Sequence, residues 1–397
     1  AFPVGGANAG FGWRLSLGEF WPGLDAEAGR FCGMCYVDAT GARHRFTDRL
    51  HHDITGQAGR WFTTDGTYLR LKQITGGWEI EFPSGEIHRF DAAGRLLEIR
   101  DRFTGRVNIT YFTDSWMITD SEERTHWIQL VNVPNYGKAV SSLSLSAFGG
   151  TNFADYAFTY ENFFVPRSCL DDYAGTTDTV QLPLLTNVSL PDGGSGYSIP
   201  LSSYFLQADL GCGTDGAARQ GLVQKVVLPT LGSVEWAYLP YFFPVPTDAS
   251  PDTDFPPTWL AAVAGVGSRT LRSASDIVEG TWTYGQSLPN GSASLESITS
   301  AISPLGDKTD HYFNVGQTTS VTYGLSFTPL TTAAPDRSDL FLSTKSYDCD
   351  AGGTNCVPKR STYVKYNAGD GDPSAPADAN PRIDASGTRY HDDLDRW

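Results

Sequence analysis

Hydrophobic and polar residues alternate along much of this chain, most clearly over residues 78–112. Leu97 and Ile99 alternate with polar neighbours there, and Val107 and Tyr111 belong to a second alternating run. A period of two residues places every other side chain on the same face of a β-strand. The pattern therefore predicts short strands, each with one apolar and one polar face.

Turn-forming residues separate these runs at short intervals. The segment from Asp91 to Gly94 has turn chemistry, and a second turn is predicted at Thr104-Gly105. Gly85 lies nine residues before Gly94, and Gly105 lies eleven residues after it. Glycine adopts positive φ readily, so we expect Gly94 to supply the left-handed residue of its turn. This spacing predicts antiparallel hairpins in a repeated arrangement.

The pattern weakens and recovers along the rest of the chain. A hairpin is predicted around residues 39–41, and further repeats are predicted around residues 228–238 and 304–313. Glu123 stands where the repeat would place a glycine, so a tight turn with positive φ is not expected there. Residues 134–220 are rich in Gly, Ser and Asp, and we interpret them as a more divergent, insert-like part of the same sheet.

The whole chain is predicted to be one all-β region. No segment shows a long periodicity of 3.6 residues, and 42 glycines and 23 prolines among 397 residues favour turns over helices. No linker of flexible composition divides the chain, so we expect residues 1–397 to form a single continuous, curved antiparallel β-sheet built from hairpins. At about 8–12 residues for each strand and turn, such a sheet would hold roughly 25–35 strands.

The segment from residue 90 to residue 111 resembles the YD repeat of the rearrangement-hotspot (RHS) family. The shared features are an aromatic–Asp pair, a Gly-Arg-Leu triplet, a later glycine and a closing aromatic residue. In this sequence they are Phe90-Asp91, Gly94-Arg95-Leu96, Gly105 and Tyr111. The resemblance is strong over residues 78–112 and intermittent elsewhere. It implies that the chain is part of a bacterial, toxin-related β-shell, and that Asp91, Gly94, Arg95, Gly105 and Tyr111 have structural roles in the repeat.

The same resemblance implies a structural or interaction protein that encloses cargo or mediates cell-surface contact. Its expected partners are the rest of a longer RHS polypeptide or neighbouring copies, together with a cargo polypeptide or a cell-surface glycan. The repeat is interrupted at Ala1 and at Trp397, so we expect the chain to be part of a longer polypeptide. The surroundings of Asp372-Pro373 do not match the self-cleaving Asp-Pro segment of the family, so no catalytic residue is carried over.

Charge and hydropathy exclude two classes of partner. The formal net charge is −16, which repels phosphate backbones and anionic lipid surfaces, so nucleic acid is not an expected partner. No apolar run approaches the ~20 residues that a membrane-spanning helix needs. We therefore expect no membrane span in this chain, while the RHS resemblance implies a secreted or cell-surface protein.

The cysteines support an oxidising compartment. Six cysteines in an acidic, glycine-rich β chain are typical of an extracellular protein. Cys349 and Cys356 flank a short loop that precedes a predicted strand, which favours a disulfide across a hairpin tip. Cys169 with Cys212 is a weaker pairing, reached by elimination. Fifteen pairings of six cysteines exist in principle.

Cys32 and Cys35 form an isolated Cys-x-x-Cys pair. A redox motif would need a βαβ context, and a zinc site would need a second pair of ligands at matching spacing. Neither is evident, although His51-His52 lies near enough in sequence to be weighed as a completing pair. A local disulfide or two buried thiols are the preferred alternatives, and both stay open.

No catalytic or cofactor-binding motif is found in the sequence. It contains no Gly-x-Ser-x-Gly elbow, no His-Glu-x-x-His and no phosphate-binding Gly-Lys-Ser/Thr loop, so we predict no enzyme activity, no metal and no cofactor. The ten Trp and eighteen Tyr leave one alternative open, a carbohydrate-binding or carbohydrate-active extracellular module. Aromatic rings exposed in a row beside paired carboxylates would favour that alternative, whereas aromatic rings turned into the sheet would favour a shell.

Overall fold

The computed structural model describes most of the chain as β-strands joined by turns. The described residues are 8–23, 33–47, 59–63, 67–134, 136–147, 152–166, 179–205, 221–244, 260–287, 296–314, 341–350, 355–366 and 383–391. Helical structure among them is confined to a 3₁₀ turn at Leu201–Ser203. No helix in this part of the chain is long and apolar enough to cross a membrane.

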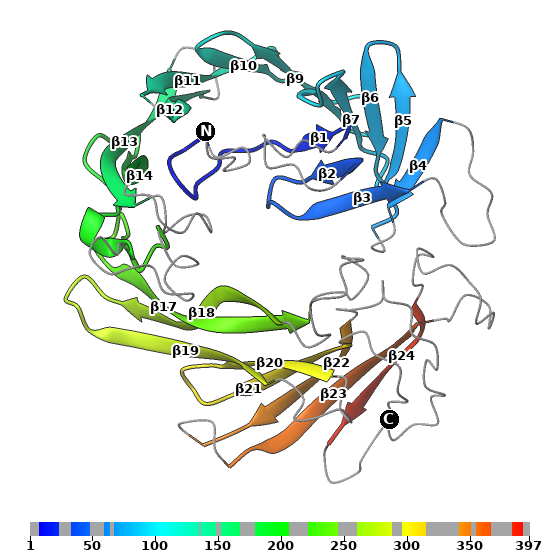
Figure 1. The fold of residues 1–397 in the computed structure, drawn as a ribbon, viewed down its shortest axis with the longest axis vertical. Helices are drawn as coiled ribbons and strands as arrows, with labels where there is room; N and C mark the ends of the chain where they lie inside the picture. Colours follow the sequence, from blue (N-terminus) through cyan, green and yellow to red (C-terminus); the bar gives the residue numbers. More distant parts are fainter. Residues whose placement is uncertain are drawn as a thin grey trace. The chain divides into compact units, whose positions relative to one another are not determined.

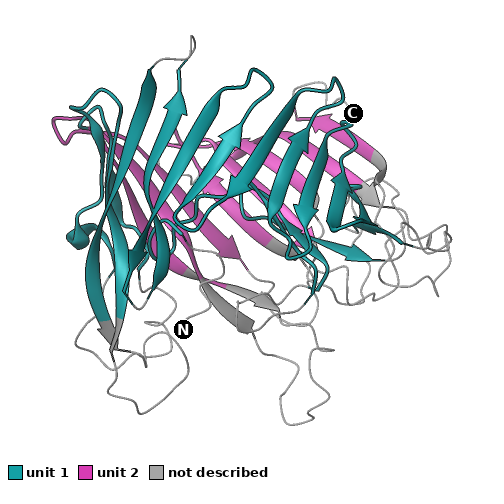
Figure 2. Cartoon of the chain, turned by 90° about the horizontal axis from the view of Figure 1, so that it is seen from above, with its two compact units in different colours: residues 1–231 teal, residues 232–397 magenta. Residues whose placement is uncertain are grey.

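The chain divides into two compact units, residues 1–231 and residues 232–397 (Figure 2). The strands of the first unit are β1 (Glu19–Trp21), β2 (Cys35–Val37), β3 (Arg43–Thr47), β4 (Arg60–Thr63), β5 (Arg70–Ile74), β6 (Gly77–Glu81), β7 (Ile87–Asp91), β8 (Leu96–Arg100), β9 (Arg106–Tyr111), β10 (Ser115–Thr119), β11 (Thr125–Val133), β12 (Gly137–Ser146), β13 (Phe153–Pro166), β14 (Thr179–Ser189), β15 (Gly196–Ser198) and β16 (Lys225–Val227). The strands of the second unit are β17 (Ser233–Pro244), β18 (Leu260–Arg272), β19 (Val278–Ser287), β20 (Glu296–Ile302), β21 (Lys308–Asn314), β22 (Phe341–Asp348), β23 (Val357–Tyr366) and β24 (Ile383–Tyr390).

Within each unit, each strand pairs with the next strand along the chain, and every such pair is antiparallel. The ladder runs from β1 to β16 in the first unit. It runs from β17 to β24 in the second unit. Figure 1 shows β5–β14 of the first unit following an arc, with β1–β3 on its inner side. The expected all-β, antiparallel and curved architecture is confirmed, whereas a single repeat region over 1–397 with a divergent part at 134–220 stays a prediction.

Cross-strand register sorts the side chains of β5–β9 onto two faces. Leu71 lies opposite Ile80, and Ile80 lies opposite His88, so these three side chains share the first face. Lys72 lies opposite Glu79 on the second face, which is polar. The alternation predicted from the sequence is therefore the alternation that separates a packed face from a charged face.

The first face is covered by β1–β3, which form a second layer on the sheet. The buried members of this cluster are Phe20, Tyr36, Phe46, Leu69, Leu71, Ile80, Phe90, Leu96 and Ile109. Phe20 is fully buried and packs near the rings of Phe46, Trp78 and Phe90, with centroid distances of 6.2, 5.1 and 6.1 Å. Burying one such side chain stabilises the fold by about 1.5–3 kcal/mol, so this cluster is a principal source of stability in the first unit.

One leucine of the predicted alternation lies on the opposite side from the one expected. A register shift between Arg89 and Phe90 pairs Phe90 with Leu96. Leu96 is buried as a result, while Leu97 is exposed. A β-bulge inserts one residue into a strand and so exchanges its two faces, which a period of two read from the sequence does not reveal.

Candidate functional site

The hairpin between β7 and β8 is closed by five consecutive residues, Asp91 to Arg95. The N–H of Asp91 donates to the Arg95 carbonyl at 2.9 Å, and the N–H of Gly94 donates to the Asp91 carbonyl at 3.0 Å. The Asp91 carboxylate accepts the N–H groups of Ala93 and Arg95 at 3.0 and 2.9 Å. Gly94 has φ +87°, as expected for the left-handed residue of a type I turn with a G1 bulge.

The same turn recurs in both units. Its first residue donates to the carbonyl of the fifth, its fourth residue donates to the carbonyl of the first, and the fourth residue has positive φ. It occurs at residues 38–42, 82–86, 91–95, 101–105, 120–124, 273–277 and 303–307. An Asp or Ser side chain at the first position usually accepts the backbone N–H groups that the turn leaves free. The repeat seen in the sequence is therefore a repeat of local hydrogen bonding.

Glu123 adopts the turn that its side chain was expected to prevent. Its φ is +60°, and its N–H donates to the Asp120 carbonyl at 3.1 Å. The prediction that the tight turn is lost was wrong because the Asp120 carboxylate holds the N–H groups of Glu122 and Arg124, each at 3.0 Å. These bonds offset the cost of a left-handed non-glycine residue.

Gly105 has a different role from Gly94. In the turn at 101–105 the positive φ, +76°, belongs to Thr104. Gly105 instead donates its N–H to the Asp101 carboxylate at 2.9 Å, and a Cβ at this position would lie 2.8 Å from Asp101 Oδ2. Gly105 therefore does not supply the left-handed residue of its turn, and the same bond to an Asp carboxylate is made by Arg95 and Arg124 at the equivalent position of two other turns.

Gly94 connects the β7–β8 turn to β1, which belongs to the inner layer formed by β1–β3. Its carbonyl accepts the N–H of Phe20 at 3.0 Å, and a Cβ at Gly94 would lie 1.7 Å from the Phe20 carbonyl oxygen. The Arg95 guanidinium lies over the Tyr111 ring at 5.3 Å, and the Tyr111 hydroxyl donates to the Leu96 carbonyl at 2.9 Å. Burial raises the pKa of Tyr111 to about 12. The structure thus places Asp91, Gly94 and Arg95 in the β7–β8 turn, and Tyr111 at the end of β9 packs against that turn.

A buried imidazole links the inner layer to the sheet. His88 lies among aromatic rings, and its Nδ1 is 3.3 Å from the Tyr36 hydroxyl. Its Nε2 lies 2.8 Å from Oε1 of Glu86. Burial lowers the pKa of His88, and this effect outweighs the opposite influence of the Glu86 carboxylate. The imidazole is consequently neutral near pH 7.

On the opposite face of the sheet, oppositely charged side chains of the neighbouring strands β5, β6 and β7 form ion pairs. Lys72 Nζ lies 2.5 Å from Glu79 Oε1, and Arg89 Nε donates to Glu79 Oε2 at 2.8 Å. Burial alone would raise the pKa of Glu79, but the hydrogen bonds from Lys72 and Arg89 outweigh it and lower that pKa. The carboxylate therefore stays ionised although it is buried, because it has two cationic partners.

A groove of about 430 Å³ opens at one end of this charged face. Its lining residues are Phe62, Tyr68, Arg70, Glu81, Phe82, Pro83, Gly85, Glu86 and Ile87. Aromatic and aliphatic side chains form its walls, and a few charged groups lie among them. This volume and this mixture are typical of a site for a small ligand or a single side chain. No pattern in the sequence indicates the groove, because its residues come from several strands and their connections.

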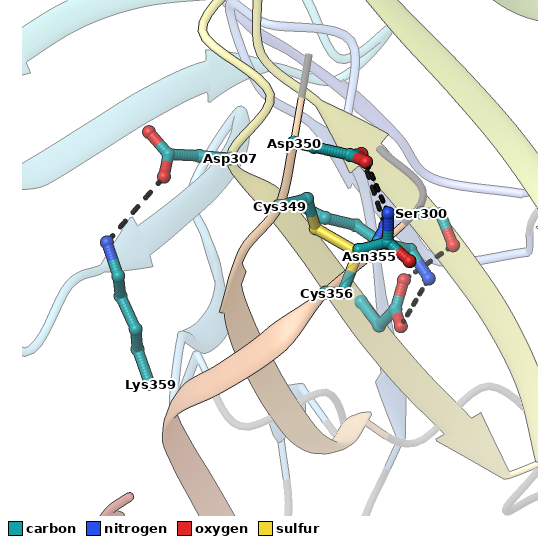
Figure 3. The surroundings of a disulfide bond; sticks show 9 residues. Ser300, Asp307, Cys349, Asp350, Asn355, Cys356 and Lys359 are labelled. Carbon is teal, nitrogen blue, oxygen red and sulfur yellow. Dashed lines mark hydrogen bonds and ion pairs between the residues drawn. A yellow bond between two sulfur atoms is a disulfide. The ribbon is translucent and has the colours of Figure 1, made fainter. Parts of the chain in front are cut away.

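The expected bridge between Cys349 and Cys356 is present in the second unit, with the two Cα atoms 4.1 Å apart. It closes the loop between β22 and β23 (Figure 3). Inside the loop, the Asp350 carboxylate accepts the side-chain amide of Asn355 at 2.6 Å. Gly306 lies against this loop, since a Cβ there would be 2.9 Å from the Cys349 carbonyl oxygen. The disulfide therefore also supports the neighbouring β20–β21 turn.

Several predicted residues lie outside the described part of the chain. They are Cys32, Cys169, Cys212, the His51-His52 pair and the Asp372-Pro373 dipeptide. Cys35 is described, and it is disulfide-bonded. This removes the buried-thiol alternative for Cys35, and the pairing of Cys169 with Cys212 stays a prediction.

A hydroxyl–imidazole contact in the second unit was not anticipated from the sequence. Ser361 Oγ lies 2.8 Å from His391 Nε2. Nucleophilic catalysis needs a hydroxyl that a substrate can reach, and Ser361 is buried. We therefore assign this contact to packing between β23 and the end of β24. Within the described ranges, no group of three or more His, Cys, Asp or Glu side chains is arranged to hold a metal ion.

The chain was compared with protein families, curated proteins and solved structures. No protein-family profile matches the chain, and no curated protein matches it. Among solved structures, a porin-like protein from Bacteroides uniformis ATCC 8492 is 14% identical over 62% of this chain and 84% of its own, with a TM-score of 0.25. Crystal structures of TcdB2-TccC3 and TcdB2-TccC3-TEV are 13% and 12% identical, each over 90% of this chain, with TM-scores of 0.18 and 0.17. This chain spans 20% and 22% of the length of those two.

Proposed function

We propose that this chain is a structural and interaction protein, one part of a secreted or surface-displayed shell of RHS-type β-hairpin repeats. Such a shell encloses cargo or mediates cell-surface contact. The proposal includes no catalytic role and no cofactor. Its partners are further repeats, from the same polypeptide or from neighbouring copies, together with a cargo polypeptide or a surface glycan.

One observation carries the proposal, namely the recurrence of the five-residue turn between consecutive antiparallel strands. In an array of this kind each hairpin contacts mainly its neighbours in the chain, so the sheet extends by repetition. Extended sheets of repeats are suited to forming walls and contact surfaces. The turn occurs in the first unit at 91–95 and in the second unit at 303–307, so both halves of the chain are built in the same way.

The sequence resemblance supports the same function. The residues that resemble the YD repeat, Asp91, Gly94 and Tyr111, hold the turn and its packing in place. The disulfide between Cys349 and Cys356 supports an oxidising compartment and hence secretion.

A second candidate, a carbohydrate-binding module, is favoured by one stacked pair of rings, the exposed Phe112 and the half-buried Trp127. Phe112 and Trp127 are stacked with their centroids 6.1 Å apart, and Phe112 is 51% exposed. Aromatic faces of this kind stack on sugar rings. Most aromatic contacts of β1–β8, however, lie in the buried cluster, which is the arrangement expected of a shell.

The two candidates differ in their state of association. An open array of strands presents edges that pair with other chains, so a shell fragment is expected to self-associate or to require its flanking sequence. Light scattering of residues 1–397 over a dilution series would show a mass that rises with concentration. A folded monomer at every concentration, combined with glycan binding that disappears in Trp127→Ala, would contradict the shell and support the carbohydrate module.

A further inference from the structure

Apolar side chains flank an ion pair in the groove on the first unit. Phe62 lies opposite Arg70, and Arg70 lies opposite Glu81. Glu81 in turn lies opposite Ile87, so these four side chains form one cross-strand row on the charged face of β4–β7. Arg70 and Glu81 pair with each other. The exposed ring of Tyr68 also lines the groove, which therefore offers mainly apolar surface to a ligand.

The same row ends beyond the groove in two adjacent arginines. Ile87 lies opposite Arg100, and Arg100 lies opposite Arg106. Arg100 Nε is 3.9 Å from Glu98 Oε1, while Arg106 is exposed and has no ion pair among the residues that the structure describes. Like charges directly opposite each other destabilise a sheet, so a carboxylate from outside would relieve the repulsion between these arginines. We call Arg100 and Arg106 the basic patch.

The β18–β19 turn of the second unit has a complementary composition. Ile277 and Val278 are 65% and 50% exposed, and they stand between Asp276 and Glu279. Asp276 Oδ1 is 3.7 Å from Arg272 Nη1, whereas Glu279 is exposed and has no ion pair within the described ranges. Adjacent exposed apolar side chains with a polar rim are typical of contact surfaces. We call residues 276–279 the acidic turn tip.

The two surfaces also match in spacing. Neighbouring strands are ~4.8 Å apart, so the basic patch lies roughly 5–10 Å from Ile87. Glu279 follows Ile277 by two residues, a separation of at most ~7 Å along the chain. When Ile277 lies beside Ile87, the Glu279 carboxylate is therefore within reach of the arginines, whose long side chains cover the remaining distance.

We propose that the groove of one copy of this chain holds the acidic turn tip of a neighbouring copy. Ile277 packs beside Tyr68 and Ile87, and the Glu279 carboxylate pairs with Arg100 and Arg106. The opposite charges of the tip and the patch orient this contact. Because the two surfaces are different, the contact is head to tail and can repeat from copy to copy. This assignment rests on the proposed function in taking neighbouring copies as partners.

The test measures association of the full chain by light scattering over a dilution series at about 0.1 M salt. Arg106→Glu and Glu279→Arg each place like charges in the contact, so each should weaken association at least about fivefold. An equimolar mixture of the two variants should associate within about twofold of wild type, because a reversed groove then meets a reversed tip. Recovery on mixing requires a contact between copies.

Three further variants serve as checks. Ile277→Ser removes an apolar side chain of the tip and should weaken association at least about fivefold without changing any charge. Arg360→Glu and Glu161→Arg reverse the same charges at exposed strand positions elsewhere, and they should leave association unchanged. Thermal melts establish that every variant is folded, and Ile277→Ser keeps the test valid if a reversed charge disturbs the fold.

Two results would overturn the contact and leave the shell in place. The first is association that is equally strong in wild type, Arg106→Glu and Glu279→Arg, as expected if copies meet through strand edges alone. The second is a mixture that associates no better than its components, which would place the effect of the variants within each chain.

Two other results separate this contact from the shell as a whole. Wild type that stays a monomer at every concentration would contradict both the contact and the self-associating shell. Monomeric variants beside an associating wild type, with recovery on mixing, would support the contact and show that strand edges do not contribute.

Discussion

The two units use the same hairpin turn but bury different kinds of side chain. In the first unit the apolar face of β5–β9 is covered by β1–β3, and rings such as Phe20 and Phe90 fill the space between the layers. In the second unit, among the residues whose burial is described, polar side chains such as Asp310, Ser343 and Ser361 are buried. The same local turn therefore supports two kinds of packing.

This difference shows that the features that determine where the strands reverse are not the features that stabilise each unit. The five-residue turn sets where each strand reverses, and it needs only a hydrogen-bond acceptor and one left-handed residue. Stability in the first unit comes from apolar burial between layers. In the second unit fewer of the described buried side chains are apolar, so hydrogen bonds such as Ser300 to Asp310, at 2.6 Å, have a larger share. Substitutions that act on one mechanism should therefore have unequal effects on the two units.

The largest effect is expected from removing the central ring of the first unit. Phe20→Ala should destabilise that unit by about 3–5 kcal/mol, because a large cavity forms between the layers. Denaturant unfolding gives the magnitude, and hydrogen exchange should show the loss of protection confined to residues 1–231. Phe103→Ala is the control, since Phe103 is 73% exposed and its loss should cost less than about 0.5 kcal/mol. Equal effects of the two variants would contradict the layered packing.

A slightly smaller effect is expected at the contact between the turn and the inner layer. Gly94→Val should cost about 2–4 kcal/mol, because strain at positive φ adds to a collision with the Phe20 carbonyl. Gly41 has φ +91°, and no neighbouring atom lies within 4 Å of the position that a Cβ would occupy there. Gly41→Val should therefore show strain alone, at about 1–2 kcal/mol. Melting curves of the two variants compare these costs, and an unchanged melting temperature in Gly94→Val would mean that the turn register is mistaken.

An intermediate effect is expected from removing the disulfide of the second unit. Replacing both Cys349 and Cys356 by Ser should destabilise it by about 2 kcal/mol, since the bond closes a short loop and restricts the unfolded chain. Hydrogen exchange should place the change in residues 232–397. Peptide mapping without reductant should recover the two cysteines in one linked peptide. Free thiols that alkylate at both positions would contradict the bridge and weaken the inference of secretion.

The smallest effect is expected in the pH dependence of the stability of the first unit, through His88. The pKa of His88 is lower in the folded protein than its usual value of about 6.5, because burial disfavours the imidazolium. The unfolded chain then binds more protons, so the stability that His88 contributes is present above pH 6.5 and decreases as the pH falls below it. Melting temperatures between pH 7.5 and 5.5 should fall more in wild type than in His88→Gln. Identical slopes would show that His88 is not responsible.

The strand path could be predicted from the sequence because it is determined locally. Asp91 and Gly94 lie within a few residues of the groups they bond, and the alternation around them gives the register directly. The error at Glu123 has a local cause as well. The sequence-based expectation considered only the missing glycine. It did not consider the Asp120 carboxylate, which accepts the backbone N–H groups of Glu122 and Arg124 and so stabilises the turn.

The inner layer and the groove could not be predicted because both depend on contacts between distant residues. Phe20 meets Gly94, and Tyr36 meets His88, across separations that leave no periodic signal in the sequence. Arg106 differs from other basic residues only through its neighbours in space. Such features need the register of several strands at once, and the bulge at Phe90 shows how one inserted residue changes that register.

The five-residue turn also has a consequence for how such a chain can change in length. All the hydrogen bonds that close a turn come from within its own five residues, as at 91–95 and 303–307. A gene segment that encodes one complete hairpin can therefore be duplicated or deleted without altering the closure of the turns on either side. Because each event adds or removes two strands, the direction of every later strand is preserved, and the sheet can grow or shrink in steps of one hairpin.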